Sequence, residues 1–472
     1  MNIIKKSINL LSCAAACLFF TCCGIKTIGR EAGEAGNREN IQSQTEGRVQ
    51  NEEEGRKEEA DSREQEQAAG PAMELPASFD LRREGRIPEI KNQGELGTCW
   101  AFASLTALET SLLPEDQLNF SEDHMSLNKN FLLGQNDGGE YTMSMAYLLS
   151  WQGPVLETDD PYGDKVSPEG LKPVKHIQEI QILPEKDYDS IKRAVVQTGG
   201  VQSSLYTSLK DSRSESEYYN KTEAAYYYDG KEKPNHDSVI IGWDDNYPKE
   251  NFNSQPPGDG AFLCMNSWGK EFGDGGCFYV SYYDTNIGIH NIVYTAAEDT
   301  DNYSRIYQSD LCGWIGQLGY GSDTAWFSNV YEAEGQEQLK AAGFYAIGAG
   351  TSYEIYVARN LDEEEKMSEG GRDIFGAMQK AAEGYLEQVG YYTILLDQEV
   401  ILSKGERFAV IVKIKSPGLI HPVAIEYDAK DGKCSIDLTD GEGYISLQGD
   451  IWERVEEKQG CNICLKAYTE EK

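Results

Sequence analysis

Apolar residues recur at helical spacing in the early part of the chain. Residues 99–113 (CWAFASLTALETSLL) and 143–153 (MSMAYLLSWQG) combine helix-forming residues with apolar positions three and four apart, which predicts two helices. Residues 177–198 indicate a strand followed by a helix. From residue 201, short apolar runs such as VQSSLY, SVIIGWD, GAFLCMNSW and GCFYVSYYD predict strands. A helical part followed by a strand-rich part is typical of an α+β fold with two lobes.

The pattern changes again after residue 300. Runs such as WFSNVYEAE, SYEIYVARN, RFAVIVKI and NICLKAYT alternate apolar and polar positions, and Gly, Asp and Asn turns separate them. Such runs are typical of an antiparallel β-sandwich. We therefore predict two folded domains, residues 75–300 and 301–472, with a long acidic loop at residues 361–373.

The N-terminus has the features of an export signal. Lys5 and Lys6 precede an apolar stretch that is too short for a membrane span and is typical of a secretory signal. The stretch FFTCCG also resembles a bacterial lipobox. The resemblance implies that residues 1–22 are a lipoprotein signal peptide and that Cys23 is lipidated, with Cys22 as the alternative acceptor and a plain secretory signal as the alternative interpretation. The expected location is extracytoplasmic, with lipid anchoring to the bacterial cell membrane.

The next segment has a different composition. Residues 23–74 are rich in Glu, Gly, Gln and Arg and contain almost no aliphatic side chains. They cannot bury enough apolar surface to offset chain entropy, which predicts a disordered acidic tether between membrane and folded body. The formal net charge of the whole chain, −36, argues against nucleic acid as a partner.

The chain contains 11 cysteines, of which four lie in the predicted signal. If Cys99 stays a free thiol, the six others could pair in an exported protein, in a connectivity that their spacing does not fix. Cys264 and Cys277 lie on strands predicted to be adjacent. Cys461 and Cys464 have CxxC spacing, but a zinc site needs a second pair, so we interpret them as structural. We predict no metal site and no cofactor.

Cys99 is a candidate nucleophile because it stands at the start of a predicted helix, where the helix dipole and free N–H groups favour a thiolate. It needs a base, and the chain has five histidines. His236 precedes the strongly apolar strand 238–243, and a histidine at a strand end can face a cleft. Asn266, in LCMNSWG, carries an oxygen that can accept the imidazole N–H, and Trp268 can shield the pair from water. The alternative for Cys99 is a buried core thiol.

Three segments stand in this order along the chain: QGELGTCWAF (93–102), NHDSVIIGWDD (235–245) and NSWG (266–269). Together they resemble the papain-like (C1 family) cysteine peptidases, and Phe120-Ser121-Glu122 and Gly138-Gly139 also fit. The resemblance covers roughly residues 75–298. It implies a two-lobed peptidase domain, with a helical lobe and a β-barrel-like lobe.

The resemblance also implies roles for individual residues. Cys99 would attack the peptide carbonyl, and His236 would form the ion pair and protonate the leaving amine. Asn266 would orient His236, and Gln93 with the Cys99 backbone N–H would form the oxyanion hole. Three further residues would contact substrate or shield the site: Gly138 and Gly139 would accommodate an extended substrate backbone, and Trp268 would cover the His–Asn pair.

The chain departs from the family pattern at three places. A disulfide usually joins a Cys three residues before the nucleophile to one just before the Gly-Gly pair, but Leu96 and the Cys-free stretch 134–137 occupy those places here. Asp237 follows His236 where a small apolar residue is usual. Its carboxylate could raise the imidazole pKa or point into solvent, and we expect it to point into solvent. The tether cannot be a folded inhibitory prodomain, so either no zymogen is needed or activity is restrained differently.

Residues 301–472 resemble the lectin-like sandwich found behind such peptidase domains in bacterial surface proteins. The overall prediction is a membrane-tethered extracytoplasmic cysteine endopeptidase that acts on polypeptides, with a cell-surface glycan or protein as a candidate partner of the sandwich. Two alternatives remain open from the sequence. One is a surface binding protein with a weak or inactive peptidase-like body, and the other is a peptidyl transferase that uses the same thioester.

Overall fold

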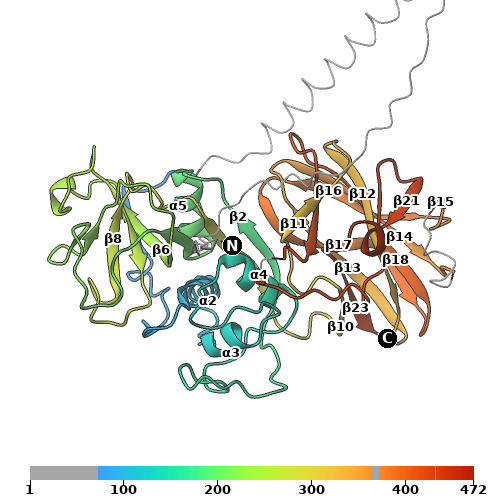
Figure 1. The fold of residues 1–472 in the computed structure, drawn as a ribbon, viewed down its shortest axis with the longest axis horizontal. Coiled ribbons are helices and arrows are strands. Elements are labelled where there is room, and N and C mark those ends of the chain that lie inside the picture. Colours follow the sequence, from blue (N-terminus) through green and yellow to red (C-terminus); the bar gives the residue numbers. More distant parts are fainter. Residues whose placement is uncertain (1–72, 363–370, 431) are drawn as a thin grey trace, which may run out of the picture. The chain divides into compact units, whose positions relative to one another are not determined.

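The computed structural model describes residues 73–362, 371–430 and 432–472 (Figure 1). The predicted signal peptide, the predicted lipid acceptor Cys23 and nearly all of the predicted tether lie outside these residues. Residues 77–472 belong to one compact unit. Within the part of the chain that the structure describes, no helix is both long and apolar enough to cross a membrane.

The main helices lie where the apolar spacing predicts them. Helix α2 (Cys99–Leu112) corresponds to the predicted helix 99–113. Strand β2 (His176–Ile182) is followed by α5 (Tyr188–Gln197), as the pattern of residues 177–198 predicts. A short helix that was not predicted, α3 (Glu122–Leu127), begins after Ser121, whose side chain accepts the His124 N–H.

Helix α4 (Tyr141–Leu149) is shorter than its pattern predicts. The apolar run continues to residue 153, but the helix ends at Leu149. Trp151 has a φ of 60°, which lies in the left-handed region and cannot continue the helix. The apolar residues beyond Leu149 therefore pack as an irregular turn, because periodicity reports which residues are buried and not where the backbone leaves the helical conformation.

The second lobe of the peptidase-like part is built on strands. They are β1 (Ser78–Asp80), β3 (Val201–Leu205), β4 (Tyr219–Asn220), β5 (Ala225–Tyr226), β6 (His236–Asp244), β7 (Ala261–Met265), β8 (Cys277–Ser281) and β9 (Asn291–Glu298). The short 3₁₀ helix η1 (Lys249–Asn251) lies in the loop between β6 and β7. Strand β6 is central, because β3 and β7 pair with its two edges and β1 also pairs with its end. Every β6 residue except Asp244 is buried.

The C-terminal part is almost entirely antiparallel strands, as the alternating pattern predicts. They are β10 (Arg305–Tyr307), β11 (Gly316–Leu318), β12 (Thr324–Glu332), β13 (Glu337–Ala346), β14 (Thr351–Arg359), β15 (Gly371–Arg372), β16 (Gln379–Leu386), β17 (Val389–Leu402), β18 (Arg407–Lys415), β19 (Val423–Tyr427), β20 (Gly443–Ser446), β21 (Ile451–Arg454), β22 (Cys461–Ile463) and β23 (Leu465–Glu471), with one helical turn, α7 (Val455–Lys458). One sheet has the order β15-β21-β20-β12-β18-β14-β16. The inner face of this sheet packs against β13, β17 and β23 to form the core. Phe327, Ile355 and Val412 lie on one side of the core, and Phe344, Leu402 and Ala467 lie on the other.

One sheet continues from the peptidase-like part into the sandwich. Strand β2 pairs with β9 on one edge and with β17 on the other, with Ile180 opposite Tyr391. At the join, a Cβ on Gly390 would lie 2.2 Å from the Ile180 carbonyl oxygen, so a larger residue would push the strands apart. The sequence pattern does not predict this pairing, because alternation identifies the buried face of a strand and not its neighbour.

The cysteines on the predicted neighbouring strands do not form a bridge. Strands β7 and β8 are paired, but Cys264 lies opposite Phe278 and Cys277 lies opposite Met265. The one-residue offset directs the two thiols to opposite faces of the sheet. None of the seven cysteines that the structure describes is in a disulfide.

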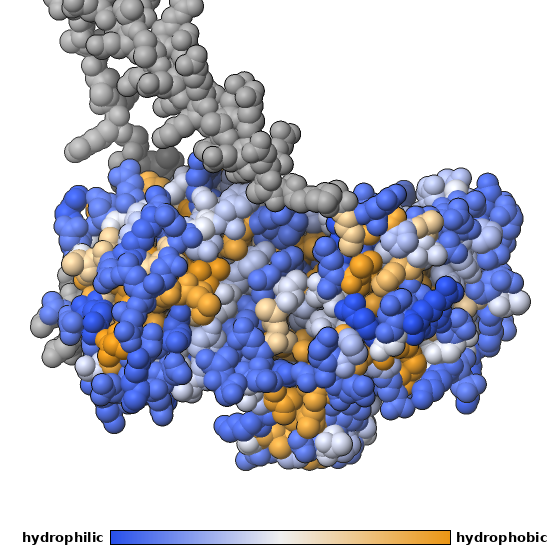
Figure 2. Space-filling model, turned by 180° about the vertical axis from the view of Figure 1, so that it is seen from behind, coloured by the Kyte–Doolittle hydropathy of each residue, from blue (hydrophilic) through white to orange (hydrophobic). Residues whose placement is uncertain are grey.

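The surface reflects the excess of acidic residues. Figure 2 shows one face of the molecule, which is mostly hydrophilic and interrupted by a few separate hydrophobic patches. The exposed large apolar side chains are scattered along the chain from Leu132 to Ile451. Single exposed apolar residues are normal on a soluble surface.

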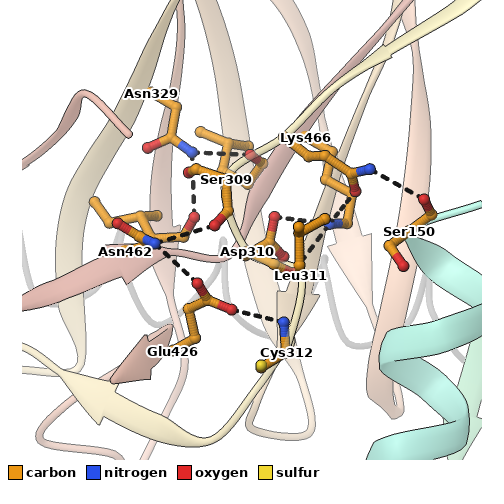
Figure 3. A network of polar contacts seen from close by, with 12 residues as sticks. Ser150, Ser309, Asp310, Leu311, Cys312, Asn329, Glu426, Asn462 and Lys466 are labelled. Carbon is orange, nitrogen blue, oxygen red and sulfur yellow. Dashed lines mark hydrogen bonds and ion pairs between the residues drawn. The ribbon is translucent and has the colours of Figure 1, made fainter. Parts of the chain in front are cut away.

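A buried ion pair stands where the sandwich meets α4 (Figure 3). Lys466 Nζ donates to Asp310 Oδ1 at 2.7 Å, and their side chains are 1% and 0% exposed. Lys466 also donates to Gln308 Oε1, and Gln308 Nε2 donates to the carbonyl oxygen of Ser150, the C-cap of α4. Hydrogen bonds thus connect the buried ion pair of the sandwich, through Gln308, with the end of α4 in the helical lobe.

We predict that Lys466→Met lowers the free energy of unfolding by about 3–5 kcal/mol, because it leaves Asp310 buried without its cation. The matched control is Lys340→Met, which removes the Lys340–Glu470 pair, whose side chains are 34% and 51% exposed. This control should change the free energy by about 1 kcal/mol or less. Urea unfolding followed by tryptophan fluorescence measures both variants. Equal effects of the two substitutions would contradict the importance assigned to the buried pair.

Candidate active site

The thiol of Cys99 lies at the N-terminus of α2, where the helix dipole favours a negative charge. The backbone N–H groups of Cys99, Trp100 and Asp237 are its hydrogen-bond partners. Asp237 directly follows His236 at the start of β6, so the helix start and the strand start meet at the thiol. The structure therefore brings the predicted nucleophile and the predicted base to one place.

His236 is held in one orientation by Asn266. Its Nε2 lies 2.8 Å from Asn266 Oδ1, and both side chains are buried. The backbone N–H of Ser267 also donates to that atom at 2.8 Å, which identifies it as the amide oxygen. An oxygen only accepts, so Nε2 carries the proton and Nδ1 of a neutral imidazole is a base. The ring of Trp268 covers the pair, with its centroid 4.7 Å from that of His236.

Gln93 is fixed by contacts on both ends of its amide. Its Nε2 donates to the Leu96 carbonyl at 2.8 Å, and its Oε1 accepts from the Ser267 hydroxyl at 2.6 Å. The amide has a second N–H, which remains available to another acceptor. Ser267 belongs to the quoted NSWG segment, but the sequence gives no signal for this contact, because it joins two segments 174 positions apart.

Tyr162 is a further residue of the site that the sequence analysis missed. Its hydroxyl donates to the Gln93 carbonyl at 2.9 Å and lies 2.6 Å from the Thr98 hydroxyl. Its ring also packs edge-on against Phe102 of α2, with centroids 4.8 Å apart. Tyr162 thus joins the Gln93 segment to the start of the nucleophile helix. It lies in a loop without periodicity, so no pattern marks it.

The glycine pair lies against the nucleophile helix. Gly138 has a φ of +81°, and a Cβ on Gly139 would lie 2.5 Å from Trp100 Nε1. Gly97 N donates to the Gln135 carbonyl at 2.8 Å, and a Cβ on Gly97 would lie 2.9 Å from Gly138 N. This backbone contact joins the two segments that the missing disulfide would join in the resembling family. Close packing therefore requires glycine at positions 97 and 139, whereas the positive φ favours glycine at position 138, where a Cβ would have space.

The expectation that Asp237 points into solvent is wrong. The residue is 8% exposed, and its carboxylate accepts from Ser204 Oγ at 2.6 Å and from Gln202 Nε2 at 3.1 Å. Gln202 in turn accepts from Ser104 Oγ of α2 at 2.9 Å. Neighbouring residues of a strand face opposite sides, and both sides of β6 are covered, so a carboxylate next to His236 must be buried.

Burial sets the protonation of the isolated groups. Burial, with the Asp237 carboxylate acting in the same direction, raises the pKa of the Cys99 thiol to about 12. Burial also lowers the pKa of His236, and the Asn266 hydrogen bond and Asp237 oppose that shift. Both shifts favour the neutral form of the group, so a thiolate without an imidazolium, or an imidazolium without a thiolate, is disfavoured. A proton passed from Cys99 to His236 creates both charges together, and their attraction then offsets the cost of burial.

We predict that Asp237→Asn shifts the pH profile of Cys99 alkylation to lower pH. Removing the negative charge stabilises the thiolate and destabilises the imidazolium, so the pKa of each group falls and both limbs of the profile move down. The rate of iodoacetamide labelling between pH 4 and 10 measures the profile. Asp159→Asn, which removes an exposed carboxylate, is the control. A shift to higher pH would contradict the role given to Asp237.

Comparisons with known protein families divide the chain into two parts. The family described as "Papain family cysteine protease" matches residues 75–297, and the family described as "Lectin like domain" matches residues 306–469. The first match includes Gln93, Cys99, His236 and Asn266.

Two curated relatives each match less than half of the chain. A viral cathepsin of Epiphyas postvittana nucleopolyhedrovirus is 27% identical over 234 residues, which cover 47% of this chain and 65% of that protein. Cathepsin K of Mus musculus is 24% identical over 210 residues, which cover 43% of this chain and 58% of that protein. The chain thus matches less than two thirds of the length of these relatives.

Solved structures match both parts together. The clostridial cysteine protease Cwp84 after propeptide cleavage superposes with a TM-score of 0.74 at 25% identity, covering 84% of this chain and 99% of that chain. The cysteine protease and lectin-like domains of Cwp84, described as a surface layer associated protein of Clostridium difficile, give a TM-score of 0.71 at 25% identity, with 86% and 91% coverage. From these matches and from the geometry around Cys99, the chain consists of a papain-family (C1) cysteine protease domain followed by a C-terminal lectin-like domain.

Proposed function

We propose that the chain is an extracytoplasmic cysteine endopeptidase that hydrolyses peptide bonds through a thioester acyl-enzyme. The observation that carries the proposal is the 2.8 Å hydrogen bond between His236 Nε2 and Asn266 Oδ1. It leaves Nδ1 of the imidazole as the base at the same strand end where the Cys99 thiol lies. The match of the papain-family pattern to residues 75–297 supports the same reaction class.

In the acylation half, Nδ1 of His236 accepts the thiol proton, and the thiolate of Cys99 adds to the carbonyl carbon of the substrate. The carbonyl oxygen becomes an oxyanion. The second N–H of the Gln93 amide and the backbone N–H of Cys99 are the donors proposed to stabilise it. The imidazolium then gives its proton to the leaving amine as the C–N bond breaks, which leaves a thioester on Cys99.

In the deacylation half, His236 acts as the general base for a water molecule. Water adds to the thioester carbonyl, the same donors hold the second oxyanion, and the C–S bond breaks. The thiolate of Cys99 recovers its proton from His236, and the carboxylic acid product leaves. Asn266 keeps the imidazole in one orientation through both halves, and Trp268 shields their hydrogen bond from water.

The remaining predictions become proposals about substrate and location. Gly138 and Gly139 form the wall along which an extended polypeptide would lie. We place the enzyme outside the cytoplasm and bound to the membrane through a lipid on Cys23. The surface-layer association of Cwp84 supports the extracytoplasmic part of this assignment. The lectin-like domain is proposed to bind a cell-surface glycan or protein.

The proposal predicts that Cys99→Ala abolishes hydrolysis of an unfolded protein substrate, because no other group replaces the attacking sulfur. Fluorescence-labelled denatured casein, incubated with the full chain, provides the assay. The matched control is Cys264→Ala, which removes a buried thiol on β7 that lies outside the active site. Hydrolysis that survives in Cys99→Ala, or wild-type protein that is folded but inactive on every peptide tested, would contradict the proposal.

A second prediction concerns the oxyanion donor. Ser267→Ala removes the hydrogen bond that holds Gln93 Oε1, so the amide loses its fixed orientation. We expect kcat to fall about 10-fold with KM nearly unchanged, whereas Gln93→Ala lowers kcat about 10²–10³-fold. Ser267→Thr, which keeps the hydroxyl, should recover most of the rate. An equal loss in Ser267→Thr would mean that the hydroxyl contact is not what positions Gln93.

A further inference from the structure

A second pair of sulfur atoms lies far from Cys99. Cys312 and Cys434, both in the lectin-like domain, are buried, and their sulfur atoms lie within hydrogen-bonding range of each other. The two positions are 122 residues apart in sequence. Two thiols in hydrogen-bond contact need only a small change in sulfur position to form an S–S bond.

Both cysteines lie against the same segment of the protease domain, Cys312 through its thiol and Cys434 through its backbone. The Cys312 thiol donates to the Asn130 carbonyl at 3.7 Å, and the Asn130 side chain donates to the Leu311 carbonyl at 3.1 Å. Phe131 forms an antiparallel bridge with Cys434, and Leu132 N donates to the Lys433 carbonyl at 2.7 Å. Residues 130–132 are therefore held between the two cysteines.

The lectin-like domain holds each cysteine in place. The Cys312 N–H donates to Glu426 Oε2 at 2.7 Å, and Asn462 donates to the other oxygen of the same carboxylate (Figure 3). The Cys434 thiol donates to the carbonyl of Tyr427, the residue after Glu426 and the last of β19. Both thiols thus adjoin one strand end, and bringing them together requires no rearrangement of the sheet.

We propose that Cys312 and Cys434 form a disulfide in the exported protein, and that this bond holds the segment 130–132 against the lectin-like domain. The proposal rests on the extracytoplasmic location in the proposed function, because disulfides persist in oxidising compartments. The segment leads directly to Gln135 and the Gly138-Gly139 pair, where the family's usual disulfide is missing. The proposed bond would therefore stabilise this part of the protease domain from the side of the lectin-like domain.

The oxidant is a disulfide compound, such as a dithiol–disulfide oxidoreductase or oxidised glutathione. The thiolate of Cys434 attacks one sulfur of the oxidant, which releases one thiolate and leaves a mixed disulfide. The thiolate of Cys312 then attacks the Cys434 sulfur and releases the second thiolate. The two cysteines lose two protons and two electrons, and the oxidant's S–S bond is reduced to two thiols.

The other described cysteines provide an internal control. Cys264 and Cys277 face opposite sides of their sheet, so they cannot be joined without breaking the register. Cys461 begins β22, Cys464 lies between β22 and β23, and both are buried. These four residues should remain thiols under conditions that oxidise Cys312 and Cys434.

The test uses the full chain carrying Cys99→Ala, which removes the proposed nucleophile, so the outcome does not depend on peptidase activity. The reduced protein is incubated with oxidised glutathione, alkylated with iodoacetamide in denaturant, digested and analysed by mass spectrometry. We expect one linked peptide pair that contains Cys312 and Cys434, with Cys264, Cys277, Cys461 and Cys464 alkylated. Alkylated or singly glutathionylated Cys312 and Cys434 would overturn the proposal.

Thermal unfolding tests the bracing role separately. Oxidation should raise Tm by about 5–15 °C, because the bond closes a loop of more than 100 residues. The shift should disappear in Cys434→Ser and persist in Cys264→Ala, with each variant compared with its own reduced form. A linked peptide without a change in Tm would overturn the bracing role. Failure of casein hydrolysis with a normal Tm shift would contradict the proposed peptidase activity and leave the disulfide standing.

Discussion

The hydrogen bond from His236 Nε2 to Asn266 Oδ1 determines which imidazole nitrogen is basic. The proposed roles of the other residues of the site depend on this assignment. The bond lies in a buried place where an unpaired imidazole N–H would be costly, so the fold must supply an acceptor there. Strand β6 supplies the histidine and the turn after β7 supplies the asparagine. Helix α2 begins at Cys99, whose thiol is hydrogen-bonded to the backbone N–H of Asp237, the residue after His236. The same turn also supplies Ser267, which orients Gln93. One strand pair and one helix start thus position Cys99, His236 and Asn266, and Ser267 positions Gln93.

Burial shields the His236–Asn266 hydrogen bond from water, but it also makes a single charge on Cys99 or His236 costly. The buried surroundings disfavour a lone thiolate or a lone imidazolium, and Asp237 adds a negative charge close to both. Proton transfer between the two groups would create both charges together, and their mutual attraction would oppose that cost. Asp237 itself is stabilised by Ser204 and Gln202, and through Gln202 by Ser104 of the nucleophile helix. The carboxylate therefore belongs to the structure that joins α2 to β6.

The lectin-like domain is joined to the protease domain through backbone and buried charge. Strand β2 pairs with β17 across the join, and Lys466 connects Asp310 with Gln308, which reaches the end of α4. Unpaired charges would be expensive in such a place, so these residues fix the contact in one arrangement. The Cys312–Cys434 bond proposed here would lie at a second point of the same join, beside residues 130–132.

The sequence predicts the parts of the molecule that depend on local pattern. Helix α2, the β2–α5 succession and the strand-rich C-terminal part follow from periodicity, and Cys99, His236 and Asn266 follow from short motifs in the right order. Contacts between distant segments were not predictable: Ser267 with Gln93, Tyr162 with Thr98, and β2 with β17 each join residues that carry no mutual signal. The error at Asp237 has the same origin. A charged residue near the end of a strand is usually exposed to solvent, so the sequence favours an exposed Asp237. Only the positions of the neighbouring strands show that its side chain is buried.

The most direct test of the central claim is labelling of the full chain with an epoxide-type cysteine-peptidase inactivator, followed by mass spectrometry to locate the adduct. The wild type is compared with His236→Ala, which removes the base and keeps the thiol. A thiolate–imidazolium pair predicts stoichiometric modification of Cys99 alone, with the adduct lost in His236→Ala. Folded wild-type protein without an adduct on Cys99, or equal labelling of the two proteins, would contradict the account.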